Sequence, residues 1–101
     1  MNQSNFEEHS RKDARLIILR ALAEQHDGVM NETLLTMTLE TFGHRRSRDW
    51  VRTQIRALEE LGAVRVIEAA SNFLIAELTR VGQDHVDRRA FVEGVARPSP
   101  R

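Results

Sequence analysis

The chain has 101 residues, of which 41% are hydrophobic, and its 15 basic and 15 acidic residues leave no formal net charge. This length fits one compact domain and excludes two, and the balanced charge lacks the basic excess usual in nucleic-acid-binding proteins. Because cysteine is absent, disulfide frameworks, thiolate zinc sites and cysteine nucleophiles are excluded. No apolar run approaches the roughly 18–20 residues of a membrane span, and the N-terminus lacks a signal-peptide pattern. We therefore expect a cytoplasmic protein with no membrane partner.

Three helices are predicted in the first two thirds of the chain. Apolar residues at helical spacing predict a first helix over residues 4–25, followed by a short extended piece at residues 29–30. Asn31 is the predicted N-cap of a second helix, which Gly43 ends, and Ser47 is the predicted N-cap of a third, which continues to Leu61 before Gly62. Residues 44–47 form a short basic turn between the last two helices.

A hairpin and a last helix are predicted to follow. Residues 63–68 and 73–78 have strand character and are joined by only four residues. Thr79 is the predicted cap of a helix over residues 80–93, and the proline-containing segment 95–101 is expected to be a disordered tail. The prediction is one domain over residues 1–94 that is mainly α with a small β-hairpin. Its order, helix-strand-helix-helix-hairpin-helix, is that of a winged helix-turn-helix.

The third helix has two unlike faces. On a helical wheel, Arg45, Arg48, Arg52 and Arg56 fall within an arc of roughly 80°, and the apolar residues lie on the other side. Between His44 and Arg56 there are five arginines and one aspartate, which gives a local charge of +4, so the other residues sum to −4. The zero net charge therefore predicts a dipolar molecule with one positive face.

This positive face predicts contact with double-stranded DNA. In a helix-turn-helix the second helix lies in the major groove, which would put Ser47, Arg48, Arg52 and Thr53 nearest the base edges. Residues of the preceding turn would lie against phosphates. The alternative is a solvated face on which arginines pair with acids at i,i+3 or i,i+4 spacing, as in Asp49–Arg52, Arg56–Glu59 and Arg56–Glu60. The candidate DNA-binding residues are His44, Arg45, Arg46, Ser47, Arg48, Arg52, Thr53 and Arg56.

Two motifs resemble winged-helix regulators of the MarR, PadR and ArsR kind. The segment 47–64, beginning Ser47-Arg48-Asp49-Trp50-Val51, is similar to their recognition helix and the entry to the wing. The segment 76–86, with Leu-Thr-x-x-Gly at residues 78–82, is similar to their junction between the last strand and the last helix. Nearly the whole chain, notably segments 11–15, 43–51 and 97–100, resembles a family of short proteins of Mu-like phages and prophages. This resemblance implies a winged-helix fold, a phage-encoded origin and a bacterial host cell.

Other chemistry has little support in the sequence. The four histidines show no i,i+3 or i,i+4 pairing, so no metal site is expected. Glycine-rich phosphate loops and a Gly-x-Ser-x-Gly nucleophile motif are absent. We therefore expect no enzymatic activity and no cofactor. Trp50 lies at the edge of the buried face, where packing is its expected role.

Two functions remain open. The first is a phage-encoded winged-helix DNA-binding protein, either a transcriptional regulator or an accessory DNA-binding factor. The second is a winged-helix protein–protein interaction module in phage assembly or DNA packaging. The second gains support from the predicted wing tip, residues 68–72, which has one acid and no base. A homodimer is a further alternative, through the apolar residues Val86, Ala90, Phe91 and Val92 of the last helix.

Overall fold

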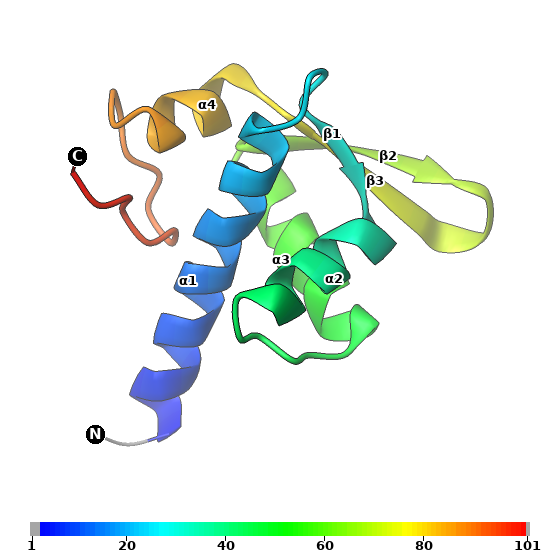
Figure 1. Cartoon of the computed structure of the whole chain (residues 1–101), viewed down its shortest axis with the longest axis horizontal. Coiled ribbons are helices and arrows are strands. Elements are labelled where there is room, and N and C mark those ends of the chain that lie inside the picture. The colour runs from blue at the N-terminus through cyan, green and yellow to red at the C-terminus, as the bar shows by residue number, and fades with distance from the viewer. Residues whose placement is uncertain (1–2, 101) are drawn as a thin grey trace.

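The computed structural model describes residues 3–100, in which the chain forms a mixed α/β fold of four α-helices and a three-stranded antiparallel sheet (Figure 1). The helices are α1 (Gln3–Ala23), α2 (Glu32–Thr41), α3 (Arg48–Glu60) and α4 (Arg80–Val86). The strands are β1 (Val29–Asn31), β2 (Val64–Ala69) and β3 (Phe73–Leu78), and a 3-10 turn (Ala70–Asn72) joins the last two.

The sheet is larger than the predicted hairpin. β2 and β3 pair in the expected antiparallel register, with Val64 opposite Leu78 and Ala69 opposite Phe73. The short piece at β1 adds a third strand, which pairs with β3 through Met30 and Ala76. The sheet order is therefore β1-β3-β2, with β3 in the centre, and the β1 pairing ties the hairpin to the segment that leads into α2.

The predicted helix starts are confirmed by their capping hydrogen bonds. The Asn31 side chain accepts from the backbone N–H of Leu34 at 2.9 Å. The Ser47 hydroxyl accepts from the N–H of Trp50 at 3.1 Å, and Thr79 caps α4 by accepting from a backbone N–H at 3.2 Å. Each cap satisfies an N–H group that has no partner within its own helix.

The core lies where α1, α2 and α3 meet the sheet. Residues of α1 spaced three or four apart, such as Ile18 and Leu22, are fully buried. They pack in one cluster with Leu39 of α2, Ile55 of α3 and residues of β3. Since the apolar face of α3 is used in this way, its arginine face is directed outward. The buried hydrophobic residues are Ala14, Leu16, Ile18, Leu19, Ala21, Leu22, Leu35, Leu39, Val51, Ile55, Leu58, Ala63, Val64, Leu74, Ala76 and Val95.

The last helix is shorter than predicted. α4 ends at Val86 rather than near residue 93, because Arg88 adopts a left-handed backbone conformation with φ of 63°. The chain then turns back, and the backbone N–H of Val92 donates to Nδ1 of the buried His85 at 2.9 Å. The imidazole thereby replaces the backbone acceptor that a continuing helix would have offered.

The structure also differs from the expected disordered tail. Val95 and Pro98 are buried, and the N–H of Ala96 donates to the carbonyl of Lys12 in α1 at 3.1 Å. The carbonyl of Ala96 lies 2.9 Å from Nε2 of His85. Residues 95–98 therefore pack against α1 and α4 (Figure 1), because they cover apolar surface that the short α4 leaves open. Residue 101 of the predicted tail lies outside the described residues.

The four residues expected to form one dimerising helix face do not share a helix. Val86 ends α4, whereas Ala90, Phe91 and Val92 follow it. Val86 and Val92 pack against the core of their own chain. Phe91 lies edge-on to His85, and the Arg97 guanidinium lies over its ring at 4.4 Å. The single apolar face that motivated the dimer is therefore absent from this part of the structure.

Within residues 3–100, no helix combines the length and the apolar character needed to cross a bilayer.

Candidate functional site

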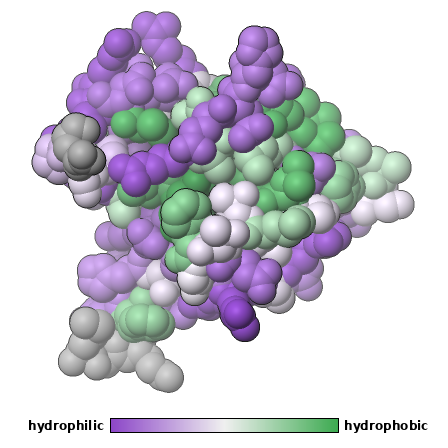
Figure 2. Space-filling view, viewed as in Figure 1, coloured by the Kyte–Doolittle hydropathy of each residue, from purple (hydrophilic) through white to green (hydrophobic). Residues whose placement is uncertain are grey.

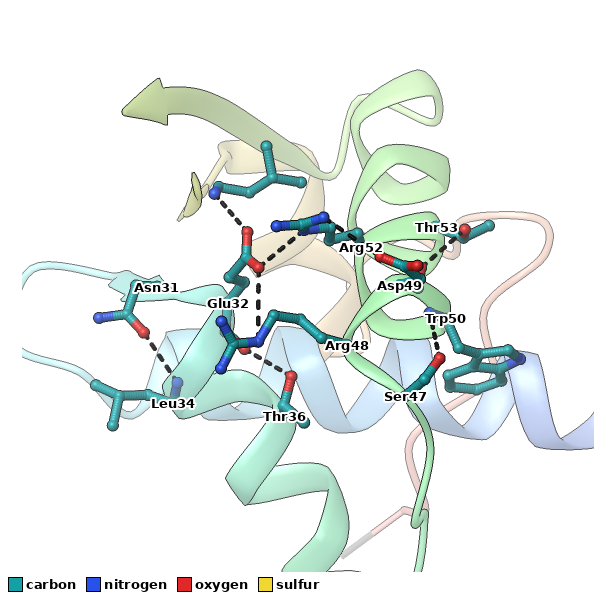
Figure 3. A network of polar contacts seen from close by, with 11 residues as sticks. Asn31, Glu32, Leu34, Thr36, Ser47, Arg48, Asp49, Trp50, Arg52 and Thr53 are labelled. Atoms are coloured by element: carbon teal, nitrogen blue, oxygen red, sulfur yellow. Dashed lines mark hydrogen bonds and ion pairs between the residues drawn. The ribbon is translucent and has the colours of Figure 1, made fainter. Parts of the chain in front are cut away.

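The predicted DNA-binding residues lie on α3 and on the turn that precedes it. Arg45 in the turn has a side chain that is 85% exposed, and Arg48 in the first turn of α3 is 50% exposed. Ser47 and Thr53 are also exposed. Figure 3 shows Arg48 and Arg52 extending from the same side of α3 toward the start of α2, whereas Thr53 extends from a different side. The site is therefore continuous along α3 but is not one flat face.

A hollow separates α3 from the β2–β3 hairpin. It has a volume of about 400 Å³ and is lined on one side by Arg52, Thr53 and Arg56 and on the other by Glu68 and Asn72. The hairpin contributes an acid and an amide to this hollow and no base, as its sequence predicted. Any strongly anionic ligand here would have to be held by α3 alone.

The predicted separation of charge is wrong in three dimensions. Each of the five arginines between residues 44 and 56 has a carboxylate oxygen within 4.0 Å, and all but one of these pairs involve an acid from outside α3 and its preceding turn. The partners come from α1, α2 and the end of α3, because folding returns distant acids to the basic segment. The pairs are Arg45–Glu40, Arg46–Glu7, Arg48–Glu32, Arg52–Glu32 and Arg56–Glu59. The positive face is thus locally compensated.

Arg46 is fixed between α1 and α3. Its guanidinium donates two hydrogen bonds to the Glu7 carboxylate, at 3.0 and 3.1 Å, and lies 4.3 Å from the centre of the Trp50 ring. The Trp50 indole N–H donates to the same carboxylate at 3.3 Å. Hydrogen bonding to Arg46 lowers the pKa of Glu7 below its ordinary value of 4.5. A bidentate pair combined with a cation–π contact is a strong, directional arrangement, so Arg46 joins two helices rather than standing free.

His44 is held in the same region. Its Nε2 lies 2.8 Å from the Asp13 carboxylate of α1. Its ring stacks beside Trp50, with centroids 6.4 Å apart and planes 17° from parallel. Trp50 packs against the core, as its position at the edge of the buried face predicted, and it also contacts His44 and Arg46 of the turn.

Arg56 connects α3 to the hairpin. One guanidinium nitrogen lies 3.0 Å from Glu59 and another lies 3.3 Å from Glu68 of β2. The hydrogen bond with Glu59 and the nearby Glu68 charge raise the pKa of Arg56 above its ordinary value. The Arg56–Glu59 pair and the Asp49–Arg52 pair at 3.3 Å are two of the contacts that the solvated-face alternative predicts. That alternative therefore describes part of this helix correctly.

Glu32 is the most buried polar residue of the site. Its carboxylate is fully buried, accepts a hydrogen bond from Arg52 at 2.8 Å and accepts another from the backbone N–H of Leu74 at 2.6 Å (Figure 3). The sequence indicated only that Glu32 lies in the first turn of α2, where an acid complements the helix dipole. No local pattern connects it with Arg52, which lies 20 residues away.

A second surface, on α2, is apolar. Leu34, Met37 and Phe42 are exposed, with Met37 at 58% and Phe42 at 64%. Beside them a groove of about 350 Å³ lies between α1 and α2, lined by Ile17, Ala21, Thr38 and Phe42 together with the charged Asp13, Arg20 and Glu24. Figure 2 shows hydrophobic side chains gathered across the middle of the face that carries α2. Exposed apolar patches of this kind often mark interaction surfaces.

Among residues 3–100, no group of three or more His, Asp or Glu side chains is placed so that it could hold a metal ion.

Comparison with known proteins gives two relatives. The chain is 44% identical over 90 residues to the uncharacterised protein gp26 of Escherichia phage Mu, an alignment that covers 89% of this chain and 92% of gp26. It is 35% identical over 77 residues to an uncharacterised protein of Haemophilus influenzae, which covers 75% of this chain and 74% of that relative. No protein-family model matches the chain, and no solved structure matches it.

Proposed function

The chain belongs to the family of phage Mu gp26, and on that premise we propose that it is a non-enzymatic winged helix-turn-helix protein that binds double-stranded DNA. The proposal covers a phage-encoded transcriptional regulator or an accessory DNA-binding factor. The order of elements supports the fold, since a helix-turn-helix pair, α2 and α3, is followed directly by an antiparallel hairpin that pairs with a short strand before α2.

The observation that carries the proposal is the exposure of Arg45 and Arg48 at the start of α3. Both are half or more exposed, and their ion pairs are the loosest of the site, at 3.9 Å and 3.8 Å. The Arg45–Glu40 pair is exposed on both sides, and such pairs contribute only about 0–1 kcal/mol. Arg48 lies beyond hydrogen-bond range of the buried Glu32, which Arg52 already bonds. A DNA phosphate or a base edge can therefore engage either arginine at little cost. The start of the second helix is also the part of a helix-turn-helix that enters the major groove.

Duplex binding measured by fluorescence anisotropy tests this proposal. The full chain is titrated onto a labelled mixed-sequence duplex at several salt concentrations. We expect the Arg45→Ala and Arg48→Ala variants to weaken binding and to lower the salt dependence by about one unit of slope for each lost phosphate contact. Arg80→Ala is the matched control, because Arg80 is 84% exposed on α4 and carries the same charge. A wild-type chain without duplex affinity at low salt would refute the proposal.

A second candidate function, a protein–protein module in phage assembly or DNA packaging, is favoured by the apolar surface of α2. Leu34, Met37 and Phe42 are exposed apolar side chains outside the proposed DNA-contact set, and the hairpin tip offers no base to DNA. The Met37→Asp variant distinguishes the two functions. Loss of a phage-protein partner by this variant, with duplex binding absent from the wild-type chain, would support the second function over the first.

A further inference from the structure

The buried Glu32 carboxylate joins three elements of the fold. It is the first residue of α2, it bonds to Arg52 of α3, and it bonds to the backbone of β3 at Leu74. Removing a carboxylate from water is costly unless charged and hydrogen-bonded partners compensate for it. Both oxygens of Glu32 have such partners, at 2.6 Å and 2.8 Å, so its position is defined from two sides.

The bond to β3 explains why an acid lies at this position. β1 ends at Asn31, opposite Ile75 of β3. The N–H of Leu78 points toward the β1 side and donates to Gly28. Because N–H direction alternates along a strand, the N–H of Leu74, four residues earlier, points to the same side. At this position β1 has ended and α2 has begun, so no strand carbonyl faces this N–H. The Glu32 side chain takes the place of the missing strand and so fixes the carboxylate beside α3.

The Glu32 carboxylate makes a close contact with Arg52 of α3 and a looser one with Arg48. Arg52 bonds to it through Nε at 2.8 Å, has a second contact with Asp49 at 3.3 Å, and is 34% exposed. Arg48 lies one turn closer to the start of α3, 3.8 Å from the same oxygen, and is 50% exposed. The separation at Arg48 exceeds hydrogen-bond range. Arg52 is therefore held in place, whereas Arg48 keeps its donors available.

We propose that the Glu32 carboxylate assigns different roles to these two arginines, with Arg52 as a positioning residue and Arg48 as the residue that contacts guanine. This inference rests on the proposed DNA-binding function and identifies the ligand more closely, as a guanine presented in the major groove. Guanine offers two acceptors, O6 and N7, to which a free guanidinium donates two hydrogen bonds. An arginine already bonded through Nε to a buried acid, as Arg52 is, holds α3 against α2 and β3.

Selection from a randomised duplex library tests the assignment. The wild-type chain, Arg48→Gln and Arg52→Gln are compared, and the preferred bases and the affinity for the selected duplex are measured. We expect Arg48→Gln to lose preference for one guanine and to bind about 5- to 150-fold more weakly. We expect Arg52→Gln to keep the wild-type base preference and to lose affinity equally for all sequences, because α3 is less well positioned.

Two further variants separate positioning from loss of folding. Arg52→Lys keeps the charge and a donor for Glu32, so it should restore both the affinity and the base preference. The double variant Glu32→Gln with Arg52→Gln removes both charges of the pair and replaces them with amides that can bond to each other. We expect it to keep the wild-type base preference, with a salt dependence equal to that of the wild-type chain. Cooperative thermal unfolding followed by Trp50 fluorescence checks that each variant is folded.

The outcomes distinguish this inference from the proposed function. If the wild-type chain binds no duplex, the proposed function is refuted and the assignment falls with it. If the wild-type chain binds a preferred sequence, but Arg52→Lys or the double variant loses the guanine preference while Arg48→Gln keeps it, only the assignment is overturned. Duplex binding without any guanine preference would also overturn the assignment and leave the proposed function intact.

Discussion

Replacement of Glu32 by alanine should destabilise the chain more than replacement of any exposed acid. The change removes a fully buried carboxylate, leaves the partly buried Arg52 guanidinium without its closest acceptor, and leaves the N–H of Leu74 without a partner. Removing one member of a buried pair costs about 3–5 kcal/mol, mainly because the other charge stays behind uncompensated. A domain of this size has a stability of about 5–15 kcal/mol, so this loss is a large fraction of the total.

A second substitution separates the contribution of the Arg52 ion pair to the free energy of unfolding from that of the hydrogen bond to Leu74. Glu32→Gln keeps an oxygen that can accept from Leu74, and it loses the charge that faces Arg52. A hydrogen bond to a charged group contributes about 1.5–3 kcal/mol, so this variant should lose that amount and no more. The difference between the alanine and glutamine variants then estimates the contribution of the bond to β3.

Urea unfolding monitored by fluorescence is the appropriate assay, because Trp50 is the only tryptophan of the chain and packs at the edge of the core beside α1. Glu40→Ala is the matched control. Glu40 also lies on α2 and faces an arginine, but its pair with Arg45 is 3.9 Å long and exposed, so we expect a change of about 0.5 kcal/mol or less. If the free energy of unfolding of Glu32→Ala lies within about 1 kcal/mol of this control, the buried carboxylate does not stabilise the fold as expected.

Three other predictions concern the rest of the fold. Gly82→Ala should destabilise the chain by about 2 kcal/mol or more in the same urea assay, because an added Cβ would lie 2.3 Å from the backbone oxygen of Ala63; wild-type stability would contradict that contact. Truncation after residue 94 should lower the melting temperature, since it removes the buried Val95 and the acceptor of His85 at Ala96; an unchanged melting temperature would mean that the tail does not pack. Glu7→Gln should flatten the loss of stability that sets in as the pH falls below the ordinary glutamate pKa of 4.5. The pKa of Glu7 is lowered in the folded chain, so its contribution is complete above its unfolded pKa and is lost as pH falls through the folded pKa. An equally steep acid profile in wild type and variant would contradict this.

Local signals in the sequence were enough to predict the order of the elements. A cap requires only that a side chain reach an N–H group two or three residues later, and Asn31, Ser47 and Thr79 all do so. The division of α3 into an apolar and a basic face follows from the helical period alone. Its apolar side proved to be the buried side, as shown by Val51, Ile55 and Leu58. Caps and helix faces are determined by residues only a few positions apart, so they can be predicted from the sequence alone.

The end of the chain could not be predicted in this way. Segment 87–89 contains neither glycine nor proline, so nothing local marks the left-handed conformation of Arg88 that ends α4. Two acceptors that lie outside the local segment stabilise this turn instead. They are the ring of His85, which accepts from the N–H of Val92, and the carbonyl of Pro98, which accepts from the Arg88 guanidinium at 2.6 Å. A proline-containing tail has the composition of a disordered segment. Here it is ordered because it packs on the apolar surface that α1 and α4 leave open.

The ion-pair partners of the candidate site could not be predicted from local sequence either. The sequence shows a run of arginines, whereas their acid partners at Glu7 and Glu32 lie 20 to 39 residues away and meet them only after folding. The residues that sequence reasoning grouped as one DNA-binding set therefore divide by their partners. Arg46, His44 and Arg52 hold the helices together, while Arg45 and Arg48 remain exposed.

This division changes what the zero net charge implies for DNA binding. A domain with a large uncompensated positive face attracts DNA over long distances and binds any sequence through phosphates. Here a carboxylate lies within 4.0 Å of each arginine between residues 44 and 56 and reduces that attraction, and each phosphate contact competes with an existing ion pair. The net gain per contact is then small, and the acids that remain nearby repel the backbone wherever α3 is not seated in the groove. Under the proposed function, affinity depends on the few groups that reach base edges from the start of α3, which makes a defined docking geometry a requirement for binding.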